Sequence, residues 1–113
     1  MGAFVTTAFA AAYPDEIRAA SHTSGGARPD RLAIIDAAPS DAVVASMRTP
    51  YQWHHGEADP IVPLLMDELL DVALARSGAP HEGHVYPGED HDIAQHPEVL
   101  ERVRAWYRAH GVL

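Results

Sequence analysis

The spacing of apolar residues along the chain alternates between the period of a helix and that of a strand. Apolar residues recur every three or four positions over 64–77 and 97–110, which predicts two amphipathic helices. Gly78 and Gly111 follow the ends of these segments, and Pro97 suits the first turn of the second one. We expect the first helix to bury one face, formed by Leu65, Leu69, Val72 and Ala73.

Two more helices are predicted from less regular patterns. Residues 2–13 are small or apolar with almost no polar face, and a helix of this kind is buried or packs against a large neighbour. Pro14 ends it, because the residue before a proline avoids the helical region. After an apolar run at 32–35, the sequence Pro-Ser-Asp at 39–41 indicates a helix start that leads into 42–45.

Three short runs between these helices predict β-strands. They cover residues 17–23, 51–54 and 82–86. Strands that alternate with helices indicate an α/β fold with parallel pairing. We therefore expect about three parallel strands flanked by helices, in a single partial domain over 1–113 whose segment 27–50 is variable or forms a small cap.

Composition limits the classes of protein to which the chain can belong. With 113 residues it is at most one small domain. Its 16 acidic residues against 8 Arg give a net charge of −8, which makes it a poor candidate for binding nucleic acid or an anionic membrane. No run approaches the roughly 20 apolar residues that span a bilayer. The absence of cysteine excludes disulfides and thiolate chemistry.

The first residues carry two sorting patterns, neither of which we adopt. MGAFVT fits a myristoylation pattern that is short enough to match often by chance. The apolar stretch 3–13 is similar to the core of a signal peptide, but no positively charged segment precedes it. The compartment therefore stays open, with a slight preference for the cytoplasm.

The candidate chemistry lies where two predicted strands end. Asp59 comes five residues after the strand 51–54, and His91 comes five residues after the strand 82–86. If the two strands are parallel neighbours, both turns open on the same edge of the sheet and the side chains can meet. An Asp that accepts a hydrogen bond from a His orients the ring as a general base. The sequence predicts Asp59 as the orienting acid and His91 as the base.

The turns that hold these two residues carry a family resemblance. HGEADPIVP at 55–63, PGEDH at 87–91 and the final helix resemble the C-terminal half of an α/β-hydrolase, of the dienelactone hydrolase, esterase and prolyl-oligopeptidase-like group. In that group the first turn carries the acid of a catalytic triad and the second carries the histidine, which correspond to Asp59 and His91. The resemblance covers about the last sixty residues well, the first twenty-six more loosely, and the middle hardly at all.

The third member of the triad has no counterpart in the chain. In this superfamily a Ser within Gly-x-Ser-x-Gly precedes the acid and the histidine, and the chain has no such motif. Met1 and Gly2 match the last two positions of the motif, which implies a fragment that begins just after the nucleophile. The helix 2–13 then belongs to the nucleophile turn. The backbone N–H of Met1 becomes an oxyanion donor in the full-length protein.

The resemblance implies a serine hydrolase that works through an acyl-enzyme without a cofactor or metal. Its substrate is a small or oligomeric ester, and the isolated chain is expected to be inactive. One alternative is a peptidase-like hydrolase. Another is a non-catalytic module that binds a partner, or a second copy of itself, through an exposed sheet edge.

Simpler interpretations exist for several other residues. Ser24 lies in the sequence His-Thr-Ser-Gly-Gly, which resembles a degraded nucleophile turn, but a turn that closes a strand is the simpler interpretation. His54 and His55, with Asp59 and His91, have the chemistry of metal ligands. Adjacent strand residues point to opposite faces, however, so the two neighbouring histidines should not share a metal. The remaining histidines are expected to be surface or half-buried residues: His81, His84, His96 and His110.

Overall fold

The computed structural model describes residues 1–28 and 37–112, and this part of the chain contains four helices and three strands. The strands form one sheet in the order β1-β2-β3, and both neighbouring pairs are parallel. The predicted α/β fold with three parallel strands is confirmed. In chain order the elements are α1 (Gly2–Ala12), β1 (Ala20–Thr23), α2 (Asp41–Val44), β2 (Tyr51–Gly56), α3 (Leu64–Ser77), β3 (His81–Tyr86) and α4 (Pro97–Ala109).

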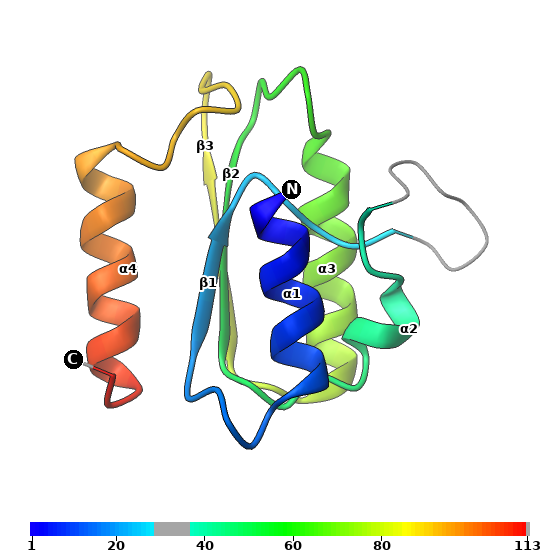
Figure 1. Ribbon diagram of the computed structural model, residues 1–113. Helices are drawn as coiled ribbons and strands as arrows, with labels where there is room; N and C mark the ends of the chain where they lie inside the picture. The colour runs from blue at the N-terminus through cyan, green and yellow to red at the C-terminus, as the bar shows by residue number, and fades with distance from the viewer. Residues whose placement is uncertain (29–36, 113) are drawn as a thin grey trace.

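The sheet separates two layers of helices. α1, α2 and α3 lie on one side of it and α4 lies on the other (Figure 1). β2 is the central strand, and all of its residues are buried, as expected for a parallel strand with both faces covered. Because the strands are parallel, the turns that follow β1, β2 and β3 lie at one edge of the sheet, and the first turn of α1 lies at the same edge (Figure 1).

The main core lies between the sheet and the helices α1 and α3. Tyr51 and Trp53 of β2 contribute its largest side chains, and Leu70 and Leu74 of α3 pack in the same cluster. Gly83 of β3 is required here, because any Cβ at this position would overlap the indole ring of Trp53. A smaller cluster joins β3 to α4 and consists of Tyr86, Ile93 and Val99.

Only one of the four residues on the predicted apolar face of α3 is fully buried. Leu65 and Val72 are about half exposed, at 52% and 51%, and Leu69 is only partly buried, whereas Ala73 is buried as expected. The sequence of this helix contains two overlapping stripes with helical spacing, and the adjacent stripe is the buried one. It contains Met66, Asp67, Leu70, Ala73 and Leu74.

The other elements agree with the predictions in type and differ mainly in length. β1 begins three residues later than expected, β2 ends two residues later, and β3 begins one residue earlier. α1 is buried on one side only: Phe4, Thr7 and Ala10 are inside, while Val5 and Phe9 are 57% and 52% exposed. Of the two expected arrangements, burial on all sides is not found within the described chain, and the helix instead packs through one side.

The segment between β1 and β2 is tied at its two ends. The backbone of Arg28 pairs with Ser40 as a parallel bridge. Ser40 also caps α2, since its side chain accepts a hydrogen bond from the N–H of Val43 at 3.4 Å. The apolar run 32–35 lies outside the described residues. Within the described ranges, no helix has the length and apolar character to cross a membrane.

Candidate active site

Asp59 and His91 are in direct contact at the carboxyl edge of the sheet. Asp59 lies in the turn after β2, His91 lies in the turn after β3, and Nδ1 of His91 is 2.9 Å from Oδ2 of Asp59. The Asp59 carboxylate is buried, whereas 31% of the His91 side chain is exposed. Because a carboxylate can only accept, Nδ1–H of His91 donates to Asp59, and in the neutral form of the ring the lone pair is then on Nε2. The arrangement suits an oriented general base.

The turn itself holds the carboxylate of Asp59 in its charged form. Its Oδ1 accepts backbone hydrogen bonds from Ile61 at 2.8 Å and Val62 at 2.9 Å. Burial alone would raise the pKa of Asp59, but the N–H of Val62, the ring of His91 and the N–H of Ile61 together lower it below its usual value. Asp59 is therefore an ionised acceptor at neutral pH.

A glycine allows the two turns to approach each other. A Cβ on Gly56, the last residue of β2, would collide with the backbone carbonyls of Glu89 and Asp90 in the turn after β3. The N–H of Ala58 donates to the carbonyl of Glu89 at 2.9 Å, which joins the turns through the backbone. The Gly of the HGEAD sequence thus has a steric reason, since the contact between Asp59 and His91 depends on this close approach.

The end of β1 joins the same group. Ser24 has a left-handed backbone with φ of 59°, and its hydroxyl donates to the backbone carbonyl of His91 at 2.8 Å. The next residue, Gly25, packs so closely on Ala3 of α1 that no side chain would fit. Ser24 therefore closes the strand and braces the His91 turn, and its hydroxyl is engaged by backbone rather than by an imidazole.

Met1 stands at the start of α1, next to this group. Its carbonyl accepts the hydrogen bond from the N–H of Val5 at 3.2 Å, and its side chain is largely exposed. Ala3 packs closely against Gly25, and the hydroxyl of the neighbouring Ser24 donates to the backbone carbonyl of His91. The first turn of α1 is thus connected to the His91 turn through the end of β1.

A buried network that sequence reasoning missed lies directly behind Asp59. Asp67, in the first turn of α3, is fully buried, and its two oxygens contact Nε2 of His22 at 2.7 Å and Nδ1 of His55 at 2.6 Å. The other nitrogen of His22 is 2.7 Å from the hydroxyl of Tyr51. The signal in the sequence was an acid at a core position of the apolar stripe of α3, a place where an unpaired charge would be too costly.

The two consecutive histidines of β2 face opposite sides of the sheet, as the strand pattern predicts. His54 contacts the hydroxyl of Tyr86 and the side-chain oxygen of Gln52, both at 2.8 Å. Burial, helped by the nearby His84, lowers the pKa of His54 to about 4, so the ring is neutral. His55 contacts Asp67 instead. Among residues 1–28 and 37–112, no group of three or more potential ligands is arranged to hold a metal ion.

The remaining histidines occupy the partly buried positions expected of them. They are His81, His84, His96 and His110. Both acids that flank His91, Asp90 and Asp92, are exposed. Among the described residues, none of these side chains forms a hydrogen bond or ion pair with the carboxylate of Asp59.

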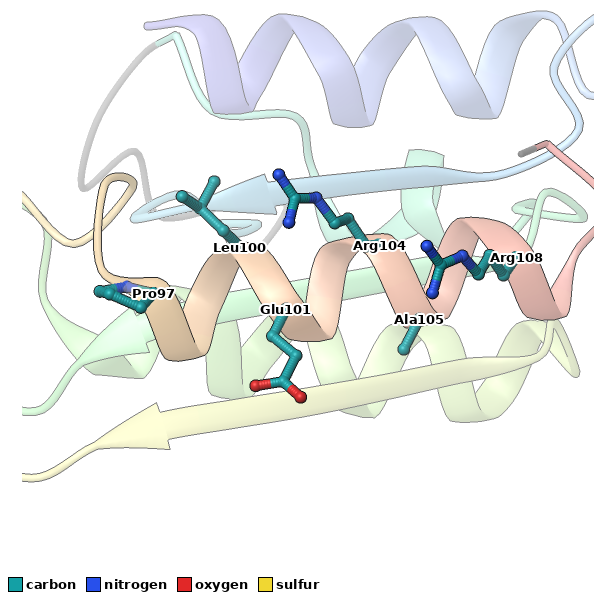
Figure 2. A pocket seen from close by; sticks show the side chains of 6 residues that line it. All are labelled: Pro97, Leu100, Glu101, Arg104, Ala105 and Arg108. Carbon is teal, nitrogen blue, oxygen red and sulfur yellow. The ribbon is translucent and has the colours of Figure 1, made fainter.

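Two surface hollows in the described chain lie away from the candidate dyad. One, of about 540 Å³, lies along α4 and is lined by residues of this helix alone, including Leu100, Arg104 and Arg108 (Figure 2). The other, of about 350 Å³, runs beside β1 and is lined by Val5, Phe9 and Tyr107, among other residues. Neither lining includes Asp59 or His91.

Comparison with known proteins identifies the family of the chain. The profile of the phospholipase/carboxylesterase family matches residues 1–110. The chain belongs to this family. The match runs through the segment 27–50, where the sequence alone suggested hardly any resemblance. The membership in the α/β-hydrolase superfamily that the turns at 55–63 and 87–91 indicated is confirmed.

The relatives of this phospholipase/carboxylesterase-family chain are longer proteins. Acyl-protein thioesterase 1 of Gibberella zeae is 37% identical over 70 residues, which are 62% of this chain and 28% of the thioesterase. A putative dienelactone hydrolase of Klebsiella pneumoniae has a similar structure, with a TM-score of 0.73 at 23% identity over 94% of this chain and 48% of that protein. The esterase PE8 has a TM-score of 0.63 at 23% identity over 82% and 39%. The chain thus spans less than half the length of these three relatives.

Proposed function

We propose that the chain carries the acid and the base of a serine hydrolase that cleaves esters or thioesters. The observation that carries this proposal is the hydrogen bond between Asp59 and His91 at the carboxyl edge of the sheet, 2.9 Å long. The family membership supports it, because the family consists of phospholipases and carboxylesterases. The name of the thioesterase relative extends the candidate substrates to acyl thioesters.

In the proposed mechanism, Nε2 of His91 removes the proton of a serine hydroxyl, which attacks the acyl carbon. Asp59 stabilises the imidazolium that forms. His91 then protonates the departing alcohol or thiol, leaving an acyl-enzyme, and afterwards activates the water that hydrolyses it. The serine belongs to a segment before Met1 in the full-length protein, and the backbone N–H of Met1 donates to the oxyanion.

The start of α1 supports the proposed role of Met1. A backbone N–H at this position belongs to the four that an α-helix leaves without an internal partner, and it lies at the positive end of the helix dipole. The link from Ala3 through Gly25 and Ser24 to His91 ties this end to the candidate base. A nucleophile directly before Met1 would therefore enter the sheet edge where Asp59 and His91 lie.

Ester cleavage is favoured over peptide cleavage. The names of the similar proteins include a thioesterase, an esterase and a dienelactone hydrolase. The segment between β1 and β2 is short, so it offers room for only a small cap over the site. We therefore expect a small or oligomeric ester or thioester as the substrate, with a peptidase-like activity as the alternative.

The test is to join this chain behind the N-terminal half of the Gibberella thioesterase, up to and including its nucleophile, and to assay p-nitrophenyl acetate and a short acyl thioester. We expect hydrolysis that Asp59→Asn and His91→Ala each reduce by at least about a hundredfold. Glu101→Gln on the outer side of α4 is the control and should leave the rate unchanged. Hydrolysis that is indifferent to Asp59 and His91 would contradict the proposal.

A second candidate function is binding of a partner through β1. Within the described chain β1 pairs only with β2, and the hollow of about 350 Å³ beside it is lined by the half-exposed Val5 and Phe9. An unpaired edge with apolar neighbours favours association with another strand, including that of a second copy. Sedimentation of the purified chain tests this: Phe9→Glu should convert an associated species to monomer, and a wild-type monomer at all concentrations would exclude self-association.

A further inference from the structure

Next to the candidate dyad lies a fully buried cluster for which the proposed mechanism has no role. It consists of Asp67 on α3 with His22 on β1 and His55 on β2. We infer that Asp67 keeps His55 protonated at neutral pH and that this buried imidazolium helps the turn to hold Asp59 ionised, which makes Asp67 a positioning residue for the acid. The consequence for catalysis rests on the proposed function, whereas the charge state of His55 does not.

The neighbours of His55 require two protons on its ring. Its Nε2 lies 2.8 Å from the backbone carbonyl of Val62, a group that can only accept. Its Nδ1 lies 2.6 Å from Oδ2 of Asp67. A ring with one proton would direct a lone pair at one of these oxygens, unless the carboxyl group of Asp67 carried the missing proton. The choice is therefore between an imidazolium facing a carboxylate and a neutral ring facing a carboxylic acid.

The surroundings of Asp67 favour the carboxylate. Its other oxygen is 2.7 Å from Nε2 of His22, so each oxygen has a ring nitrogen within hydrogen-bond distance, and two such donors would stabilise the ionised form. Asp67 also lies in the first turn of α3, where the helix dipole stabilises negative charge. Burial alone would raise the pKa of Asp67, but the charges and hydrogen bonds of His22 and then His55 lower it. Burial alone would lower the pKa of His55, but Asp67, Val62 and Asp59 raise it.

His54 and His22 show that the requirement is specific to His55. One neighbour of His54 is the hydroxyl of Tyr86, and one neighbour of His22 is the hydroxyl of Tyr51. A hydroxyl can donate to a ring nitrogen as well as accept from it, so neither ring needs a second proton. Among residues 1–28 and 37–112, the hydrogen-bond neighbours of the His55 ring are only Asp67 and Val62, so it has no such hydroxyl. Two consecutive residues of β2 therefore differ in charge: His54 is neutral on one face of the strand, and His55 is a cation on the other.

The imidazolium reaches the candidate dyad directly. Nε2 of His55 is 3.5 Å from Oδ2 of Asp59, the same oxygen that accepts from His91. The side chains of both His55 and Asp59 are fully buried, so water screens their interaction little. In the part of the chain that the structure describes, the titratable groups that face His55 are Asp59 from the turn, Asp67 from α3 and, beyond Asp67, His22 from β1. Among the described residues, His55 thus places a cation beside Asp59 that does not depend on substrate.

The charge state can be measured on the 113-residue chain itself, by long-range proton–nitrogen NMR of the imidazole rings. We expect both nitrogens of His55 to carry protons from pH 5 to pH 8, while His54 shows one protonated nitrogen at pH 7. Asp67→Asn keeps the shape and can satisfy a neutral His55, since its amide donates to Nδ1. In this variant we expect a neutral His55 and a rise in the titration midpoint of Asp59 by at least about half a pH unit, read from its carboxyl carbon.

Asp71→Asn is the matched control, one turn further along α3, where the carboxylate accepts from the indole N–H of Trp53 at 2.9 Å. It should change neither His55 nor Asp59. If Asp67→Asn fails to fold, His55→Gln removes the same cation and should raise the Asp59 midpoint as well. An unprotonated nitrogen on wild-type His55 at pH 7, or an unchanged Asp59 midpoint in a folded variant, would overturn the inference. Neither readout depends on hydrolysis, so failure of the proposed enzyme activity is a separate result.

Discussion

Gly56 lies so close to the backbone carbonyl of Asp90 that a single added carbon would overlap it. The two residues belong to different strand ends, yet their contact determines how near the turn of Asp59 comes to the turn of His91. The candidate active site therefore requires a residue without a side chain at position 56. This requirement can be tested without any knowledge of the substrate.

We predict that Gly56→Ala separates the two turns. The added methyl group forces backbone to move, which costs about 1–3 kcal/mol in the free energy of unfolding. The downfield NMR signal of the Nδ1 proton of His91, which reports its hydrogen bond to Asp59, should weaken or disappear. Gly2→Ala is the control, because a Cβ there meets nothing within 4 Å. Unchanged denaturation midpoints in Gly56→Ala would refute the steric argument.

Substitutions of Ser24 can distinguish two roles for its hydroxyl, a structural brace and a nucleophile. As a brace for the His91 turn, it contributes one buried hydrogen bond to a backbone carbonyl. Ser24→Ala should then cost about 1 kcal/mol. Ser24→Gly should cost less, because glycine relieves the left-handed backbone with φ of 59°.

Activity provides the second measurement for Ser24. In the enzyme completed with an N-terminal half, Ser24→Ala should keep its rate within a fewfold of the wild type. A nucleophile would lose at least about a thousandfold. A loss of that size would reinstate Ser24 as the nucleophile and contradict the assignment of the serine to a preceding segment.

The sequence predicted the order of the elements and the contact between Asp59 and His91 for a simple physical reason. In a parallel sheet the strand ends converge on one edge, so residues shortly after two strands can be brought together without knowledge of side-chain positions. Asp59 and His91 both follow such strands, and the structure brings them into contact. Their turn sequences also carried the family resemblance.

The buried network could not be predicted in the same way. Asp67 occupies a core position of α3, and hydrophobic spacing alone assigns acids to the exposed side of a helix. Its presence inside depends on His22 and His55, which come from two different strands. Only the register of β1 against β2 brings these histidines to one carboxylate. The pattern of a single sequence segment does not contain this register.

The two apolar stripes of α3 allow the buried face of this helix to be tested by substitution. Leu70 is fully buried, so Leu70→Ala should lower the free energy of unfolding by about 2–5 kcal/mol. Leu65→Ser and Val72→Ser, on the stripe that the sequence pattern favoured, should each change it by less than about 0.5 kcal/mol. Urea denaturation of the three variants checks the assignment. A larger loss in Leu65→Ser than in Leu70→Ala would mean that the helix is packed by its other face.

The pKa values of His54 and His55 are shifted in opposite directions, which predicts a maximum in stability near neutral pH. The pKa of His54 is lowered from 6.5 to about 4, so below pH 6.5 the unfolded chain binds the proton more readily and stability falls as the pH falls. The pKa of His55 is raised above 6.5, so its contribution is complete below pH 6.5 and is lost as the pH rises through the folded value. Each limb has a slope of up to about 1.4 kcal/mol per pH unit.

Denaturation midpoints measured from pH 4.5 to pH 9 test both limbs, and each limb has its own variant. His54→Gln removes the group that titrates on the acid side, so the loss of stability below pH 6.5 should become shallower while the alkaline side keeps its slope. Asp67→Asn leaves His55 neutral, so the alkaline limb should flatten while the acid limb remains. If both variants change the same limb, or if wild-type stability rises steadily up to pH 9, the assignment of charge to His55 and of neutrality to His54 is wrong.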